Sequence, residues 1–209
     1  MAAVDRNAAA LGVPRKQLME SSGNAVARAV RRVAEPGASV AVVAGRGNNG
    51  GDGLVAARFL DDYAVTVHLL GRPETIRTRI ARENWDALQV AAYDTRTVTD
   101  PADIDLGDPD VVVDAMLGTG VTGDLREPEA TAARATDDAD ATVVSVHAPS
   151  GVYADTRESG GAPLDAVRIL PSLAPKPPLD GLAPAVPVGD LAVPAPPHPA
   201  VRPAVLASL

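Results

Sequence analysis

The chain has 209 residues, of which 46% are hydrophobic, which suffices for one three-layer domain with a tail. Its 27 acidic residues exceed its 19 basic ones and give a net charge of −8. An acidic surface of this kind repels nucleic-acid phosphates and anionic membranes, so we expect neither as a partner. The absence of cysteine excludes disulfides, thiolate metal sites and a cysteine nucleophile.

Two further features concern the compartment. The excess of aspartate, the two lysines Lys16 and Lys176, and the aromatic content of 2% are typical of proteins from salt-accumulating cytoplasms. Residues 1–7 lack the basic-then-apolar order of a signal peptide, and no apolar run approaches membrane-spanning length. The sequence therefore predicts a cytoplasmic protein.

The pattern along the chain alternates between helical and extended spacing. We expect helices at 15–34, 54–60, 75–89 and 129–138, and strands at 39–44, 65–70, 111–113 and 142–146. Such alternation favours an α/β fold, a three-layer α/β/α Rossmann-like sandwich with a mostly parallel sheet. Ligands of these sheets bind beyond the carboxyl ends of the strands, where three loops of this chain should meet.

The domain organisation follows from the distribution of proline. We expect residues 1–170 to form the Rossmann-like domain and residues 171–209 to form a proline- and alanine-rich C-terminal extension. Dense proline excludes long helices and central strands, so one edge strand around Gly189-Asp190 is the most that the extension could add.

The first glycine-rich loop is the segment Gly45-Arg46-Gly47-Asn48-Asn49-Gly50, with the spacing G-x-G-x-x-G between a strand and a helix. Its main-chain N–H groups could cradle a diphosphate; the less favoured alternative is that the glycines only make a tight turn. The acidic residue that usually closes the second strand and binds a ribose hydroxyl is absent, since Leu70-Gly71-Arg72 stands there. No Gly-Lys-Ser/Thr follows the loop. A conventional dehydrogenase and a P-loop are therefore both disfavoured.

Several polar groups after the strands suit a cation or a ribose. Asn48, Asn49 and Asp52 offer hard oxygen ligands. Asp114 ends an apolar strand, where a carboxylate is costly unless it is paired or bound to a cation, although it could instead cap the next turn. Residues 118–124 could offer a second set of main-chain N–H groups to phosphate.

The last strand leads into two further candidates. His147 could carry a proton or stack on a ring, but a lone histidine is more often an ordinary half-buried residue. Ser150 lies between Pro149 and Gly151, and no Asp-His pair is placed to make it a nucleophile, so we interpret it as a ligand.

Three of these segments, read together, resemble the YjeF N-terminal domain family, the NAD(P)H-hydrate epimerases. They are Gly45 to Gly53, Asp114-Ala115-Met116-Leu117-Gly118-Thr119-Gly120, and Pro149-Ser150-Gly151. The opening Leu18-Met19-Glu20-Ser21-Ser22-Gly23 is similar to that family's first helix. The resemblance covers about residues 5–151 and is faint from residue 165 onward.

The resemblance implies an isomerase that interconverts the R and S forms of NADHX and NADPHX, the hydrated reduced cofactors, so that an S-specific dehydratase can restore them. It implies a potassium ion held by Asn49, Asp114 and Ser150. The implied substrate-binding residues are Asn48, Asn49, Gly50, Gly51, Asp52, Gly118, Thr119, Gly120, Val121, Thr122, Gly123 and Asp124. The sequence leaves open the preference between NADHX and NADPHX, and whether the chain forms a homodimer.

One departure from the family concerns the catalytic position. The family has aspartate two residues before its Pro-Ser-Gly, and this chain has His147 there. Neutral imidazole accepts a proton but gives no fixed negative charge to a cationic intermediate. The chain is thus either an active epimerase with His147 as its catalytic residue, or a weakened or inactive dinucleotide-binding or scaffold member of the family. Because residues 118–123 contain no lysine or arginine, phosphate should depend on main-chain donors and on Arg46, Arg72 or Arg126.

Overall fold

A parallel β-sheet forms the centre of the molecule, as shown by a computed structural model that describes residues 12–118, 125–147, 150 and 168–170. Neighbouring strands pair in parallel throughout the described sheet. The strands in sheet order are β3 (Asp94–Val98), β2 (Ala64–Leu70), β1 (Ser39–Ala44), β4 (Val111–Ala115), β5 (Thr142–Val146) and β6 (Arg168–Leu170). The predicted α/β class and parallel sheet are confirmed.

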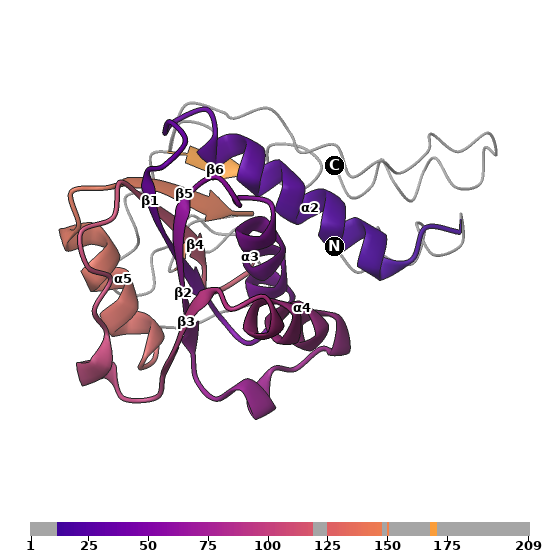
Figure 1. Ribbon diagram of the computed structural model, residues 1–209. Coiled ribbons are helices and arrows are strands. Elements are labelled where there is room, and N and C mark those ends of the chain that lie inside the picture. The colour runs from indigo at the N-terminus through magenta and orange to yellow at the C-terminus, as the bar shows by residue number, and fades with distance from the viewer. Residues whose placement is uncertain (1–11, 119–124, 148–149, 151–167, 171–209) are drawn as a thin grey trace, which may run out of the picture.

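Helices cover both faces of this sheet (Figure 1). Helices α2 (Arg15–Val30), α3 (Asn48–Arg58) and α4 (Arg79–Val90) lie on one face, and α5 (Glu129–Asp138) lies on the other. Side chains alternate along β1, so that Val40 and Val42 join the larger apolar cluster, while Ala41 and Val43 join the smaller one with residues of α5. The result is the predicted three-layer α/β/α arrangement.

The strand order places a switch point between β1 and β4. From β1 the chain first builds β2 and β3 on one side, and it then crosses to β4 on the other side of β1. Val43 pairs with Asp114 and Ala44 with Ala115 in the β1–β4 register. The loops that follow β1 and β4 therefore leave the sheet side by side, which is where ligands of open parallel sheets bind.

The main difference from the expected elements is the start of α3. The helix begins at Asn48, so most of the glycine-rich segment is helical, whereas the sequence pattern predicted a helix only from residue 54. Glycine has a low helix propensity, so the sequence pattern did not predict a helix over this first turn and a half of α3. A Cβ atom added to Gly50 would lie 1.8 Å from the Gly45 carbonyl oxygen, so close approach of the two backbones requires glycine there.

Other boundaries differ for local reasons. The first helix ends at Val30 rather than near residue 34. A helix was expected from residue 75, but Thr75 is the last residue of a 3-10 turn, η1 (Pro73–Thr75). Helix α4 starts only after Thr78, whose hydroxyl accepts a hydrogen bond from the Ala81 N–H. The helix at 129–138 and the strand at 142–146 have the predicted bounds.

Strands β3 and β6 were not expected from the sequence. β3 is the sequence Asp94-Thr95-Arg96-Thr97-Val98, which is largely exposed and carries no apolar run, and it is followed by a second 3-10 turn, η2 (Pro101–Asp103). The predicted extension 171–209 lies outside the described residues, so the boundary at residue 170 stays a prediction. Within the described ranges, no helix is long and apolar enough to cross a membrane.

Candidate functional site

The site begins at Asp114, a fully buried carboxylate in β4. Its Oδ1 atom accepts hydrogen bonds from the Ser150 hydroxyl at 2.6 Å and from the Met116 N–H at 3.2 Å. Its Oδ2 atom accepts from the Ser150 N–H at 2.8 Å and from the Ser145 hydroxyl at 3.0 Å. Four donors therefore converge on one carboxylate.

These contacts answer the question that the sequence raised about Asp114. Burial raises the pKa of its carboxyl group, and the hydrogen bonds from Ser150, Met116 and Ser145 oppose that rise. The bond from the Met116 N–H is the turn cap that the sequence offered as one alternative. Hydrogen bonds thus compensate part of the cost of the buried carboxylate.

Asn49 approaches the same corner from the first turn of α3. Its Nδ2 atom donates to the Leu117 carbonyl oxygen at 2.9 Å, and the Leu117 N–H donates to the Ser150 hydroxyl at 3.2 Å. Asn49 is 7% exposed, and its Oδ1 atom is buried with no hydrogen-bond partner among the described residues. The predicted trio of Asn49, Asp114 and Ser150 is therefore gathered around the turn after β4.

His147 and Asp52 form a second contact at the rim. The His147 ring, at the end of β5, places Nε2 3.0 Å from Oδ2 of Asp52 in α3, and their side chains are 12% and 8% exposed. His147 has a backbone φ of 69°, in the left-handed region that residues with a Cβ rarely adopt. Its Nδ1 atom is buried and has no hydrogen-bond partner in the described part of the chain.

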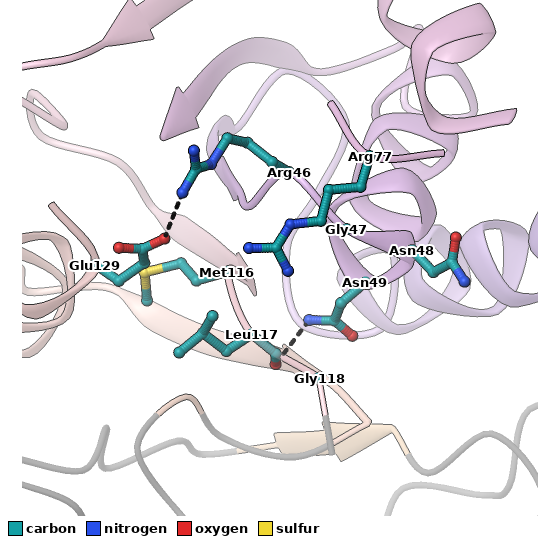
Figure 2. A pocket seen from close by; sticks show the side chains of 9 residues that line it. All are labelled: Arg46, Gly47, Asn48, Asn49, Arg77, Met116, Leu117, Gly118 and Glu129. Carbon is teal, nitrogen blue, oxygen red and sulfur yellow. Dashed lines mark hydrogen bonds and ion pairs between the residues drawn. The ribbon is translucent and has the colours of Figure 1, made fainter. Parts of the chain in front are cut away.

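A pocket of about 270 Å³ opens beside this corner (Figure 2). The residues that line it are Arg46, Gly47, Asn48, Asn49, Arg77, Met116, Leu117, Gly118 and Glu129. They come from the loop after β1, the start of α3, the segment before α4, the turn after β4 and the start of α5. The pocket therefore lies at the switch point of the sheet.

The predicted substrate-binding residues divide into four groups. Asn48, Asn49 and Gly118 line the pocket, whereas Gly50 faces Gly45, and a Cβ on Gly51 would meet the Met19 side chain in α2. Asp52 contacts His147 instead. The remaining predictions, Thr119, Gly120, Val121, Thr122, Gly123 and Asp124, lie outside the described residues.

The charged residues of the pocket were predicted only in part. Of the three arginines named from the sequence, Arg46 lines the pocket, and Arg72 and Arg126 are not among its lining residues. Arg77 and Glu129 were missed. Nothing in the local sequence marks either of them, because an arginine before one surface helix and a glutamate at the start of another are common on exposed faces.

The described residues contain no group of three or more histidine, aspartate and glutamate side chains that could hold a metal ion. The set of Asn49, Asp114 and Ser150 is of another kind, since it combines an amide, a carboxylate and a hydroxyl oxygen.

Comparison with known proteins identifies relatives along most of the chain. Residues 15–177 match the family described as YjeF-related protein N-terminus. The NAD(P)H-hydrate epimerase of Cenarchaeum symbiosum is 39% identical over 158 residues, which cover 75% of this chain and 74% of that protein. The bifunctional NAD(P)H-hydrate repair enzymes Nnr of Hyperthermus butylicus and Methanothermobacter thermautotrophicus are 41% and 45% identical, and this chain spans 34% and 31% of their lengths.

A solved structure agrees with these matches. The crystal structure of the yeast protein ynu0 (YNL200c) superposes with a TM-score of 0.66 at 27% sequence identity, covering 81% of this chain and 76% of the yeast chain. The sequence matches and the superposition both extend over most of the chain. The chain belongs to the YjeF-related protein N-terminal family.

Proposed function

We propose that this protein is an NAD(P)H-hydrate epimerase, which interconverts the R and S forms of NADHX and NADPHX. The observation that carries the proposal is the convergence of Asn49, Asp114 and Ser150 around the turn after β4, next to a pocket at the switch point of the sheet. The names of the archaeal relatives support the same activity.

A potassium ion held by Asn49, Asp114 and Ser150 is part of this proposal. The buried Asn49 Oδ1 atom lacks a partner among the described residues, and a monovalent cation would satisfy it. Asp114 supplies the negative charge, and Ser150 supplies a hydroxyl oxygen that already touches the carboxylate. These are hard oxygen ligands of the kind that alkali cations accept. The ion would neutralise the buried carboxylate and fix the turn that carries Leu117 and Gly118.

The proposed chemistry uses His147 to move one proton at the C6 hydroxyl of the substrate. If the hydroxyl leaves as water, it takes a proton from the ring, the nitrogen lone pair forms a C=N bond, and water adds to the other face while the ring takes the proton back. If the ring of the substrate opens instead, His147 removes the hydroxyl proton, a C6=O bond forms as the C6–N bond breaks, and the substrate nitrogen takes up a proton; the reverse steps then close the ring on the other face of the carbonyl. Both routes need one positioned proton carrier.

Asp52 can supply the negative charge that is lost when His147 stands in place of the family's aspartate. Its nearly buried carboxylate lies 3.0 Å from Nε2, so the histidine and the aspartate together can hold a proton and place negative charge near a cationic intermediate. With Nε2 bound to Asp52, Nδ1 is the ring nitrogen without a partner among the described residues, but it is buried and His147 is not among the pocket-lining residues, so the proposed proton exchange requires the ring to become exposed when substrate binds. We therefore favour the active epimerase over the scaffold alternative.

The test is an assay of the purified protein with an S-specific dehydratase, at high potassium, on a mixture of R and S NADPHX. The dehydratase alone should leave the R form, and addition of this protein should let the R form be consumed. His147→Asp should be slower than the wild type if imidazole is the working proton carrier, whereas a faster variant would mean that the replacement of the family's aspartate had weakened the enzyme. Dinucleotide binding without any consumption of the R form would favour the scaffold role instead.

The remaining parts of the proposal concern partners and compartment. A dehydratase that consumes the S form is the proposed functional partner, since bifunctional Nnr relatives carry the epimerase-like segment in about a third of their length. We propose a cytoplasmic location, where reduced dinucleotides are used. Light scattering of the purified chain would decide whether it forms a homodimer.

A further inference from the structure

Two arginines stand at the pocket of a strongly acidic chain. The protein has a net charge of −8, yet the charged residues that line this pocket are Arg46, Arg77 and Glu129. Figure 2 shows both guanidinium groups at the pocket, with Arg77 drawn between Arg46 and Asn49. The lining thus holds an excess of positive charge where the rest of the chain is negative.

Arg46 is held in place by the end of β2. A Cβ atom added to Gly71 would lie 2.7 Å from Cδ of Arg46, so the arginine side chain runs directly over this glycine. Gly71 also has φ of 121°, which an L-residue with a side chain rarely adopts. The Arg46 guanidinium lies 4.0 Å from the Glu129 carboxylate, which is a long ion pair. Arg46 therefore retains the capacity to bind a second anion.

A backbone hydrogen bond fixes Arg77 beside Arg46. The Arg77 N–H donates to the Arg46 carbonyl oxygen at 2.8 Å, which ties the loop after β1 to the segment after β2. The Arg82 guanidinium donates to the carbonyl oxygens of Glu74 and Ile76, at 2.9 and 2.8 Å, and holds that segment. The Arg77 guanidinium itself has no ion pair or hydrogen bond with the described residues, so it is available to a ligand.

We propose that Arg46 and Arg77 bind the 2′-phosphate of NADPHX, and that the protein therefore prefers NADPHX to NADHX. This inference rests on the proposed function. In Rossmann-like folds an acidic residue at the end of the second strand binds the ribose 2′-hydroxyl and repels a 2′-phosphate, whereas a nearby arginine accepts that phosphate. Here the end of β2 has Gly71 with Arg46 packed across it, and Arg77 follows six residues later.

The chemistry of the two side chains suits a phosphate monoester. Each guanidinium presents a planar set of N–H donors that matches phosphate oxygens, and two such groups balance a dianion. The diphosphate bridge of the dinucleotide has a different place, at the N-terminus of α3 formed by Gly47, Asn48 and Asn49. The arginines lie toward β2, where the adenosine ribose of a dinucleotide sits in folds of this topology.

The test measures binding of two small probes by calorimetry, adenosine 2′,5′-bisphosphate and AMP, which differ only in the 2′-phosphate. Wild type should bind the bisphosphate more tightly than AMP by about tenfold or more. Arg77→Gln should reduce this ratio to about threefold or less, with AMP affinity unchanged. The matched control is Arg72→Gln, which makes the same charge change outside the pocket lining and should keep the wild-type ratio.

A second variant acts in the opposite direction. Glu129→Gln removes the carboxylate that competes for Arg46 and repels a phosphate, so the bisphosphate should bind more tightly than to wild type. If Arg77→Gln weakens AMP and the bisphosphate equally, the arginines contact the 5′-phosphate and the inference is wrong. The inference is also wrong if the wild type binds the bisphosphate and AMP with equal affinity.

These measurements separate the inference from the function on which it rests. An active epimerase that treats NADHX and NADPHX alike, with no probe preference, would overturn only the role of the arginines. Failure of the epimerisation assay together with an arginine-dependent preference for the bisphosphate would overturn the proposed function, while the phosphate site would stand.

Discussion

The Nε2 atom of His147 lies 3.0 Å from Oδ2 of Asp52, which joins the end of β5 to the first turns of α3. Both side chains are nearly buried, and their chain positions are 95 residues apart. A carboxylate bound to one ring nitrogen fixes the tautomer and the orientation of an imidazole, as in catalytic Asp-His pairs on other folds. Asp52 is therefore placed to act as the positioning residue for His147.

Replacing the carboxylate should show this role directly. We predict that Asp52→Asn lowers kcat by about tenfold to a hundredfold with little change in KM, and that His147→Asn lowers it by about a hundredfold to ten-thousandfold. Nitrogen NMR of the three histidines should show the proton of His147 on Nε2 in wild type and a changed signature in Asp52→Asn. A rise in KM with unchanged kcat would make Asp52 a substrate contact instead.

Potassium should stabilise the folded protein through Asn49. A ligand that binds only the folded state adds about 2.7 kcal/mol at a concentration a hundred times its dissociation constant, so Tm should rise with KCl. Tetramethylammonium chloride at equal ionic strength is the control for screening. Asn49→Ala should remove the potassium-specific rise, and the exposed neighbour variant Asn48→Ala should keep it. Equal responses of both variants would place the ion elsewhere.

The glycines of the first loop give a matched pair for stability. Gly50→Ala should cost about 2 kcal/mol or more, because the new Cβ would lie 1.8 Å from the Gly45 carbonyl oxygen. Gly47→Ala meets nothing within 4 Å and should cost about 1 kcal/mol or less. Urea unfolding of both variants measures the difference. Since alanine favours helix over glycine, a stabilised Gly50→Ala would mean that the backbone contact between Gly45 and α3 does not restrict residue 50.

His68 should make the fold sensitive to mild acid. This β2 residue is 1% exposed, and its buried Nε2 atom has no partner among the described residues. Burial lowers the pKa of His68, the charge of Arg96 lowers it further, and Asp94 and Asp105 act in the opposite direction. Below about pH 6.5 the unfolded chain therefore binds a proton that the folded chain resists.

The sign of this effect is a loss of stability on acidification. The contribution of His68 is complete above about pH 6.5 and falls as pH decreases toward its lowered folded pKa, by at most about 1.4 kcal/mol per pH unit. His68→Leu should show a smaller loss of unfolding free energy between pH 7 and pH 5 than wild type, in urea titrations at each pH. An unchanged slope would mean that other groups control the acid response.

Local signals in the sequence determined the elements that are long or strongly patterned. The strand at 142–146 and the helix at 129–138 have the predicted bounds because apolar runs and a proline-led helix start are local properties. The polar edge strand β3 was missed, since it exists through backbone pairing with β2 and has no apolar pattern of its own. The first turns of α3 were missed because their glycines have low helix propensity. At Gly50 the glycine is needed for close approach to the backbone of the loop after β1.

The sequence by itself determined the family and the α/β class, since these follow from motifs that are contiguous in the chain, and the family resemblance predicted Asn49, Asp114 and Ser150 as cation ligands. Only the tertiary structure decided which groups meet. It paired His147 with Asp52, left Asn49 Oδ1 buried without a partner in the described part of the chain, and brought Arg46 and Arg77 to one pocket while Arg72 stayed outside its lining. The reason is physical: distances between loops depend on strand order and register, which set long-range contacts that no short stretch of sequence encodes.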